Sequence, residues 1–463
     1  MRFLEGLILK PYTEIKKGQS IEIDIEGMAH EGQGIGRIDG MAVFVEGALK
    51  GERVRARIDK TARNYAIAHL EKIQVPSQER ITPACPHAER CGGCSLQHLS
   101  YKGQLEFKTQ KVKDSLERIG RIKTIVHDTI GMPDPWRYRN KAQYPVGEER
   151  GQAVLGFYEK RTHSIVPSNS CMIQHGINDD VAATVKEWAN RCRVPVYNEE
   201  KHTGLLRHVV TKVGMKTGEV MVILVVNGDE IPNKKELIEL LQKNIKGFKS
   251  LILNKNDRRT NVILGSRNTL LFGSPYIYDY IGEIKFSLSP LSFFQVNPVQ
   301  VEILYEKALE YAGLTGDETV IDTYCGIGTI TLFLARRARK VYGIEIVDAA
   351  VKDARHNAEI NGISNVEFIE GAAEEVMPEL VRKGARADVI VMDPPRRGCD
   401  EKLLKAAVDM APRNMVYVSC NPATLARDLR FLEDRGYQTK EVQPVDMFPH
   451  THHVECVTLM SRV

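Results

Sequence analysis

Residues 318–346, ETVIDTYCGIGTITLFLARRARKVYGIEI, decide the fold. The pattern predicts a short buried strand, a glycine turn, a helix and a second strand. Gly326 and Gly328 let the backbone approach a ligand closely where the helix begins. Thr331 stands where a dinucleotide-binding fingerprint has its third glycine. Glu345 ends the second strand, where a carboxylate can accept hydrogen bonds from ribose hydroxyls.

Two further strand ends follow along the chain. In ADVIVMDPPRRG (387–398), a buried strand delivers Asp393 at its C-terminal end. In NMVYVSC (414–420), the next strand delivers Cys420. The stretches YQTKEVQPVDMF and HVECVTLMSR then have the alternation of a closing antiparallel pair. This order resembles the class I methyltransferase fold, an α/β Rossmann-like domain that binds S-adenosylmethionine.

Cys420 has three interpretations: a packing residue, a metal ligand or a nucleophile. Free cysteine is among the most buried residue types, which favours packing. Asn421 is a plausible helix cap and Pro422 fits a first helical position, so the thiol precedes a helix N-terminus, which favours the thiolate. Ligands also bind at the C-terminal ends of strands in open α/β sheets. Location therefore favours the nucleophile.

A cysteine beside an Asp-Pro-Pro loop favours methylation at carbon, whereas the loop alone would favour an amino nitrogen. Carbon 5 of uracil is a poor nucleophile. A thiolate that adds to carbon 6 turns the ring into an enolate, which can attack a methyl sulfonium. A base must then remove the carbon-5 proton. Chain order makes Glu455, in HTHHVEC, the best-placed carboxylate, and the alternative is a surface glutamate.

A group of cysteines lies upstream, in ACPHAERCGGCSLQH (84–98). Cys85, Cys91 and Cys94 have the spacing C-x5-C-x2-C, and a cluster needs a fourth thiolate. Cys171 and Cys192 are both candidates by position. Three close cysteines and one distant one favour a [4Fe–4S] cluster, while a zinc site of four cysteines is the competing interpretation.

Two regions have features of RNA-binding proteins. Residues 10–73 predict about five short strands with glycine turns, as in a small OB-type barrel, and resemble the TRAM module of RNA-modifying enzymes. The stretch WRYRNKAQYPV (136–146) interleaves aromatic and basic residues, a pattern that holds single-stranded RNA; an edge strand with charged outer positions is equally compatible.

Residues 104–121, which lie between these two regions, predict an amphipathic helix whose lysines form its solvated side. Its apolar face is expected to contain Leu105, Val112, Leu116 and Ile119.

Composition excludes several classes of protein. The 463 residues are 27% charged and 43% hydrophobic, as is usual for globular proteins, and the net charge of +4 requires any RNA-binding surface to be local. The apolar run VMVILVV (220–226) is too short to span a bilayer. Glu5 interrupts the apolar N-terminus, which argues against a signal peptide. Nine cysteines in a long chain fit a reducing cytoplasm rather than a disulfide framework. We expect a cytoplasmic monomer that does not bind membranes.

Five motifs together, SCNPATLARDL, DPPRRGC, FFQVNP, DTYCGIGT and HTHHVE, resemble the RNA uracil-5-methyltransferase family over nearly the whole chain. The resemblance implies that Cys420 is the nucleophile and Glu455 the base. It implies that the S-adenosylmethionine contacts are Gln295, Tyr324, Glu345 and Asp393. It also implies that the ligands of a [4Fe–4S] cluster are Cys85, Cys91, Cys94 and Cys171.

The resemblance further implies an organisation and a substrate. The expected parts are an N-terminal OB-like TRAM β-barrel (10–73), a central α+β iron–sulfur domain (74–103 and 135–275) and the catalytic domain (104–134 and 276–463). The cluster favours 23S ribosomal RNA, since the better-known transfer-RNA branch of the family is shorter and lacks these features. Transfer RNA remains the first alternative. A methylthiotransferase and an RNA-binding assembly factor without chemistry are others, which the cysteine spacing and the presence of Cys420 and Glu455 oppose.

Overall fold

The computed structural model describes residues 15–463, which form two compact units. One holds the described residues through Pro83 with Ser95–Phe107 and His450–His452, and the other holds Ala84–Cys94, Lys108–Pro449 and His453–Val463. The expectation about a signal peptide falls on residues outside the described ones. No helix in residues 15–463 is both long enough and apolar enough to cross a membrane. The division into three domains stays a prediction.

A six-stranded sheet forms most of the first unit. Its order is β1 (Ser20–Asp24), β5 (Arg53–Thr61), β6 (Tyr65–Val75), β4 (Met41–Glu46), β3 (Gly34–Ile38) and β2 (Gly27–Met28). Exposure alternates along β1, and Ile21 and Ile23 face the core of this unit. Gly36 is needed where β3 passes β1, because a Cβ there would lie 2.4 Å from the carbonyl oxygen of Asp24.

A seven-stranded sheet occupies the middle of the chain. Its order is β10 (Ile165–Pro167), β9 (Gln152–Tyr158), β8 (Lys141–Glu149), β11 (Leu206–Val213), β12 (Val220–Val226), β13 (Phe248–Lys255) and β14 (Arg267–Gly273). The helices α2 (Gly176–Arg191) and α3 (Lys234–Asn244) pack in one core with it. The apolar run at 220–226 is the inner strand β12, which is buried along its whole length. A hairpin, β15 (Ile277–Ile281) and β16 (Ile284–Leu288), follows.

An eight-stranded sheet carries the C-terminal third. Its order is β19 (Val366–Glu370), β18 (Lys340–Glu345), β17 (Thr319–Asp322), β20 (Val389–Met392), β21 (Asn414–Ser419), β23 (Glu455–Arg462), β22 (Tyr437–Val445) and β7 (Ile125–Val126). The first five strands are parallel, and β23 pairs antiparallel with both β21 and β22. The strand order reverses at β17, whose neighbours are β18 and β20. Such a switch point is where ligands bind in open α/β sheets.

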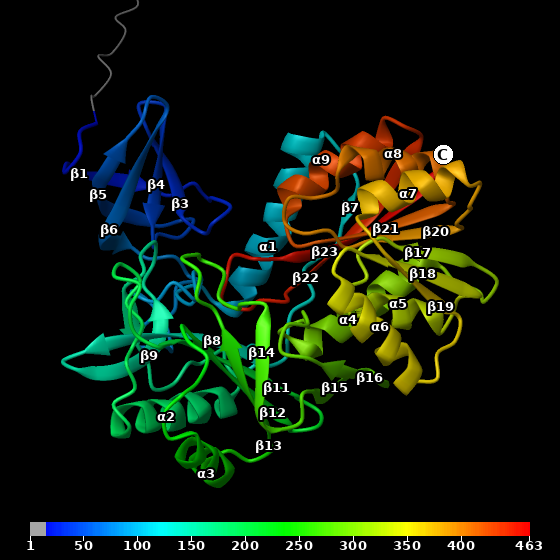
Figure 1. Cartoon of the computed structure of the whole chain (residues 1–463). Coiled ribbons are helices and arrows are strands. Elements are labelled where there is room, and N and C mark those ends of the chain that lie inside the picture. Colours follow the sequence, from blue (N-terminus) through cyan, green and yellow to red (C-terminus); the bar gives the residue numbers. More distant parts are fainter. Residues whose placement is uncertain (1–14) are drawn as a thin grey trace, which may run out of the picture. The chain divides into compact units, whose positions relative to one another are not determined.

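Helices cover both faces of this sheet (Figure 1). One face packs against α4 (Pro298–Ala312), α5 (Thr329–Ala335) and α6 (Asp348–Ile360). The other packs against α7 (Ala373–Arg382), α8 (Glu401–Met410) and α9 (Pro422–Glu433). Two separate apolar cores therefore hold the sheet between them, as expected for a doubly wound domain.

The predicted amphipathic helix is α1 (Tyr101–Ser115), which continues as one π-helical turn, Leu116–Gly120. Val112 and Leu116 are buried as expected, whereas Ile119 is 48% exposed. The prediction that the lysines of this helix are solvated is wrong for Lys108. Its side chain is fully buried, forms an ion pair with Asp446 and donates a hydrogen bond to the Phe448 carbonyl (3.1 Å). A buried ammonium requires such partners, and they come from the other end of the chain.

Candidate active site

Three predicted site residues and one further carboxylate, Asp322, lie at one edge of the eight-stranded sheet. Asp322 ends β17 and Glu345 ends β18, while Asp393 and Cys420 directly follow β20 and β21. Because these strands are parallel, their carboxyl ends lie at the same edge. The structure thus brings the glycine turn, the Asp-Pro-Pro loop and the cysteine to the switch point.

The glycine turn between β17 and α5 is held by two carboxylates. Gly326 and Gly328 have φ of +54° and +86°, in the left-handed region that favours glycine. The N–H of Gly326 donates to Glu345 Oε2 at 3.1 Å. Thr331 Oγ1 donates to Asp322 Oδ2 at 2.6 Å. Thr331, which stands at the place of the missing third glycine, therefore holds the buried Asp322 in position. Burial raises the pKa of Asp322 to about 6.

Cys420 lies between β21 and α9, as predicted. Asn421 caps α9 by accepting a hydrogen bond from the Ala423 N–H at 3.1 Å, and Pro422 is the first helical residue. In the antiparallel pairing of β21 with β23, Ser419 is opposite Cys456. One further step of this register places Cys420 opposite Glu455, with both side chains on the same face. The predicted nucleophile and base are therefore neighbours.

The charges around Cys420 oppose the thiolate. Burial, followed by the charges of Glu455 and Asp393, raises the pKa of the Cys420 thiol to about 11, and Arg396 lowers it only in part. Burial and the charge of Asp393 also raise the pKa of Glu455 well above its usual range. These surroundings oppose the expected effect of the helix N-terminus, which favours the thiolate. Two nearby carboxylates and burial outweigh the partial positive charge of a helix end.

Asp393 and Arg396 belong to a loop that is fastened to α9. The Arg396 carbonyl accepts hydrogen bonds from Asn421 Nδ2 (3.1 Å) and Thr424 Oγ1 (3.2 Å). Burial, and then the charge of Asp322, raise the pKa of Asp393 to about 7. The loop thus holds one carboxylate and one guanidinium near Cys420 and Glu455.

Gln295 is buried in the loop between β16 and α4. Its carbonyl accepts a hydrogen bond from Asn140 Nδ2 at 3.0 Å. Two residues later, Asn297 caps α4 and donates from Nδ2 to the Met447 carbonyl at 3.1 Å. The segment of Gln295 is therefore tied to the loop between β22 and β23. Tyr324 is partly buried beside Cys399, and burial raises the pKa of its hydroxyl.

The four cysteines predicted as cluster ligands all belong to the second unit, and their role as ligands stays a prediction. Burial, and to a smaller extent the charge of Cys85, raise the pKa of Cys91; burial, with a small contribution from the charge of Cys91, raises the pKa of Cys171 to about 11. Cys94 and Cys171 pack against one small apolar cluster. Cys192 instead packs in the core of the seven-stranded sheet and donates to Glu236 (3.3 Å). Among residues 15–463, no three His, Cys, Asp or Glu side chains are arranged to hold a single metal ion.

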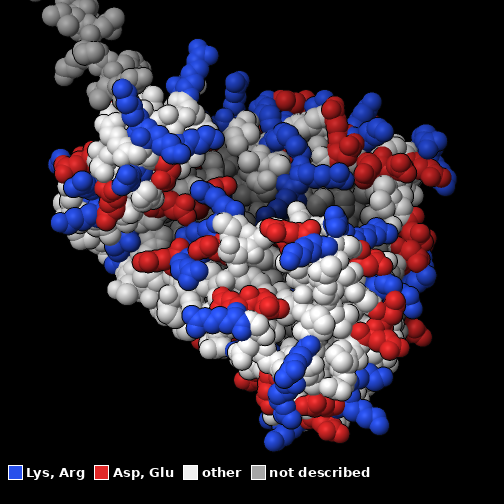
Figure 2. Space-filling view, turned by 60° about the vertical axis from the view of Figure 1, so that its left-hand side comes forward, with Lys and Arg blue, Asp and Glu red and all other residues white. Residues whose placement is uncertain are grey.

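Within the aromatic and basic stretch at 136–146, Tyr138 is not available for the predicted stacking on RNA, while a role of the partly exposed Trp136 stays a prediction. Tyr138 is 2% exposed and donates to the Pro449 carbonyl (3.1 Å), and Arg137 pairs with Asp179 (2.7 Å). The edge-strand alternative is also wrong, since β8 lies between β9 and β11. Figure 2 shows acidic and basic side chains interspersed over the face in view.

Sequence reasoning missed two residues of the site. Asp322 was part of the quoted DTYCGIGT motif, and its position at a strand end was the available signal. Arg396 follows the Asp-Pro-Pro sequence and is the cation that lowers the pKa of both Cys420 and Glu455. A lone cation beside three acidic groups has no recognisable sequence pattern, because those groups come from separate strands.

Similar proteins are known from several bacteria. An uncharacterized RNA methyltransferase of Caldanaerobacter subterraneus is 57% identical over 97% of this chain and 100% of its own length. Another, from Halalkalibacterium halodurans, is 53% identical over 98% of this chain and 99% of its own. Residues 233–463 match the family model described as tRNA (uracil-5-)-methyltransferase, and residues 14–70 match the TRAM domain.

The chain belongs to the RNA (uracil-5-)-methyltransferase family. Among solved structures, it resembles the Pyrococcus abyssi tRNA (uracil-54, C5)-methyltransferase in complex with S-adenosyl-L-homocysteine. The TM-score is 0.76 at 28% identity, covering 95% of this chain and 100% of the other. The predicted class I methyltransferase fold with an N-terminal TRAM domain is confirmed, and so is the prediction of an RNA (uracil-5-)-methyltransferase, class EC 2.1.1, that uses S-adenosylmethionine.

Proposed function

We propose that this methyltransferase forms 5-methyluridine in 23S ribosomal RNA, with Cys420 as nucleophile and Glu455 as base. One observation carries the mechanism. The register of β21 and β23, extended one step beyond Ser419 and Cys456, sets Cys420 opposite the buried Glu455, at the switch-point edge of the sheet. A class I methyltransferase that acts on nitrogen needs neither group, whereas methylation of a pyrimidine carbon needs both.

The two side chains complete a balanced reaction. The Cys420 thiolate forms a bond to carbon 6 of uracil, and the displaced electron pair makes carbon 5 nucleophilic. When bound, S-adenosylmethionine supplies the methyl group that carbon 5 attacks. Glu455 then takes the carbon-5 proton, and the electron pair of that carbon–hydrogen bond restores the double bond between carbons 5 and 6. The carbon–sulfur bond breaks at the same time, and its electron pair leaves with sulfur as the Cys420 thiolate. The thiol must first lose its proton, against the charges that raise its pKa.

Four residues would hold the cofactor: Gln295, Tyr324, Glu345 and Asp393. Their surroundings fit a cationic ligand, because Glu345, Asp393 and Asp322 bring carboxylates to the switch point. Glu345 already accepts hydrogen bonds from the Gly326 and Val347 N–H groups, which orient it next to the glycine turn.

Asp393 should make cofactor affinity depend on pH. Its pKa of about 7 means that the carboxylate is mostly neutral at pH 6 and mostly ionised at pH 8. A cationic ligand favours the ionised form, so affinity should rise about tenfold between these values and then level off. Calorimetry with S-adenosylmethionine would measure this rise.

Asp393→Asn provides the control for that measurement, because it has no carboxylate to titrate. The variant should bind weakly at both pH values and should lose most of the tenfold rise between them. If the affinities of the wild type and the variant depended on pH in the same way, Asp393 would not be a cofactor contact.

A [4Fe–4S] cluster held by Cys85, Cys91, Cys94 and Cys171 is part of the proposal. All four thiols are partly buried, and none is in a disulfide. The Gly93 N–H points at Cys91 Sγ (3.4 Å), as is suitable for a thiolate ligand. Such a cluster bridges thiolates that lie farther apart than the ligands of one ion. We assign it a structural role, since no step of the reaction requires electron transfer.

Transfer RNA is the second candidate substrate, and one observation favours it. The similar Pyrococcus abyssi enzyme acts on transfer RNA and is matched over its whole length, so chain length no longer separates the two substrates. The four-cysteine segment, through the family resemblance, is the remaining support for ribosomal RNA. We further propose that the protein acts as a monomer in the cytoplasm, in agreement with nine cysteines of which none forms a disulfide.

Mapping of 5-methyluridine in cells that lack this protein tests the substrate. We expect at least one 23S ribosomal position to change from modified to unmodified, with transfer RNA unaffected. Restoring the wild-type gene should restore the modification, whereas the Cys420→Ala gene should not. Loss confined to transfer RNA would replace the ribosomal assignment, and an unchanged map of both RNAs would contradict the proposed function.

A further inference from the structure

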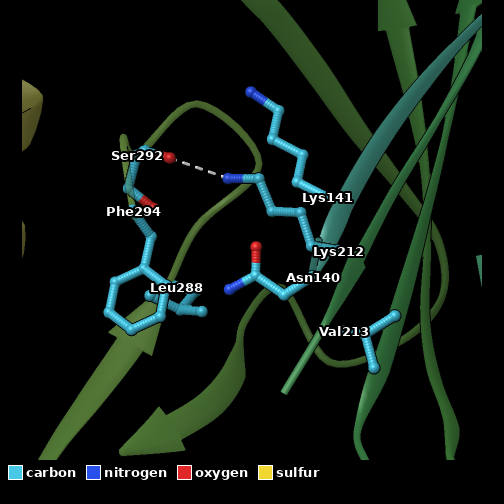
Figure 3. A pocket seen from close by; sticks show the side chains of 7 residues that line it. All are labelled: Asn140, Lys141, Lys212, Val213, Leu288, Ser292 and Phe294. Atoms are coloured by element: carbon cyan, nitrogen blue, oxygen red, sulfur yellow. Dashed lines mark hydrogen bonds between the residues drawn. The ribbon is translucent and has the colours of Figure 1, made fainter. Parts of the chain in front are cut away.

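A pocket lies where the seven-stranded sheet meets the loop that carries Gln295 (Figure 3). Its lining consists of Asn140, Lys141, Lys212, Val213, Leu288, Ser292 and Phe294. The polar groups are two ammoniums, one amide and one hydroxyl. This lining lies wholly within the described part of the chain and includes no Asp or Glu. The pocket is therefore rich in hydrogen-bond donors and positive charge.

Lys212 is the buried cation of this pocket. Its ammonium donates to the carbonyls of Ser289 (2.7 Å) and Ser292 (2.8 Å), which uses two of its three N–H groups. Burial lowers the pKa of Lys212 well below its usual range; the charge of Lys141 lowers it further, while that of Asp353 raises it. Asp353 itself accepts a hydrogen bond from Ser289 Oγ at 2.9 Å. The Asp353 carboxylate is therefore close to Lys212.

Lys141 extends from the start of β8 toward the same side of the pocket as Lys212 (Figure 3). Burial and the charge of Arg139 lower the pKa of Lys141. Nε of Arg139 is buried, and no group among the described residues accepts a hydrogen bond from it. Lys141 and Lys212 therefore line one pocket as neighbouring basic groups, and Arg139 lies close to Lys141. Like charges repel most strongly in such partly desolvated surroundings. An anion between them would remove that repulsion.

The pocket adjoins the segment of Gln295, which is a proposed cofactor contact. Asn140 donates from its backbone to the Val296 carbonyl and from its side chain to the Gln295 carbonyl, both at 3.0 Å. An anion bound here would contact the segment that holds Gln295. RNA carries one phosphate per nucleotide, so a substrate whose uracil enters the site brings phosphates close to it.

We propose that Lys141, together with Lys212 and Asn140, binds one backbone phosphate of the RNA substrate beside the target uridine. The inference rests on the proposed function. The carboxylate of S-adenosylmethionine is the other anion with suitable chemistry, and the experiment separates the two.

Lys141→Met keeps the length of the side chain and removes its charge. With a labelled RNA transcript that the wild-type enzyme methylates, we expect the Kd to weaken about tenfold. The slope of log affinity against log salt concentration should fall by about 0.7, the value for one phosphate of a single strand. Affinity for S-adenosylhomocysteine should not change. Lys243→Met, at an exposed lysine of α3, is the matched control and should leave the salt slope unchanged.

Each other outcome contradicts the inference. An unchanged salt slope for Lys141→Met would exclude a phosphate contact. Weaker binding of S-adenosylhomocysteine with unchanged RNA affinity would assign the anion to the cofactor. Thermal melting verifies that each variant is folded, and Lys212→Gln supplies a second test if Lys141→Met is not. If the wild-type enzyme methylates no RNA, the proposed function fails first and this inference falls with it.

Discussion

Glu455→Gln is expected to accumulate a covalent adduct between protein and RNA that carries the transferred methyl group. Methyl transfer precedes proton removal, so an enzyme without its base stops after the carbon–sulfur bond and the methyl group are in place. Glutamine keeps the shape of the side chain but cannot accept the proton. Turnover should fall by about 10²–10⁴-fold, the usual contribution of a general base.

A denaturing gel would show this adduct as a band of reduced mobility that contains both RNA and the labelled methyl group. Wild-type enzyme should give the same band on RNA with 5-fluorouridine at the target, because fluorine cannot leave as a proton. Glu401→Gln, an exposed carboxylate at the start of α8, should behave as the wild type. The double variant Cys420→Ala with Glu455→Gln should form no band.

Two results would overturn this mechanism. A shifted band that survives the loss of Cys420 would assign the bond to another residue. The absence of any band, on RNA that the wild-type enzyme demonstrably methylates, would indicate direct transfer and return Cys420 to a packing role.

Cys91→Ala and Cys171→Ala are expected to abolish an iron cofactor and to damage folding before chemistry. Wild-type protein purified without oxygen should be brown and contain about four iron atoms per chain. Either substitution removes one of four ligands, and metal binding of this kind contributes directly to folding. Iron analysis, the visible spectrum and thermal melting would measure the loss.

Cys192→Ala is the matched control, since Cys192 packs in a different core and donates to Glu236. It should retain the iron and the colour. Stoichiometric zinc without visible absorbance would establish the competing zinc site. Iron that is lost from Cys192→Ala but retained in Cys171→Ala would reassign the fourth ligand.

The sequence was sufficient to predict the features set by local rules and by chain order. Asn421 and Pro422 indicate where α9 begins, because helix capping involves only adjacent residues. Chain order placed Asp393 and Cys420 after successive parallel strands, and strand ends of this kind share one edge. These rules act within a few residues or follow from topology, so they need no knowledge of distant contacts.

The features that escaped prediction depend on distant partners. Lys108 has the sequence context of a solvated helix residue, yet Asp446 and Phe448 bury it from far along the chain. Tyr138 was expected to stack on RNA, but its hydroxyl bonds to Pro449 inside the protein. The pKa of Cys420 is likewise raised by burial and then by the charges of Glu455 and Asp393 from other strands, whereas the local pattern predicted the opposite direction.

The two-residue strand β7 has a consequence for how the enzyme is made. It pairs with β22 through Ile125↔Glu441 and Val126↔Val442, although the partners are more than 300 residues apart. The ribosome therefore releases this edge strand long before its partner exists, and the seven-stranded sheet is synthesised in between. Pairings of such high sequence separation form late, since the loop that they close must first be ordered. The hairpin of β22 and β23 is synthesised last. It joins β7 to the rest of the eight-stranded sheet and brings Glu455 to Cys420. A ribosome-bound chain that lacks this hairpin should be able to fold its middle but not to methylate.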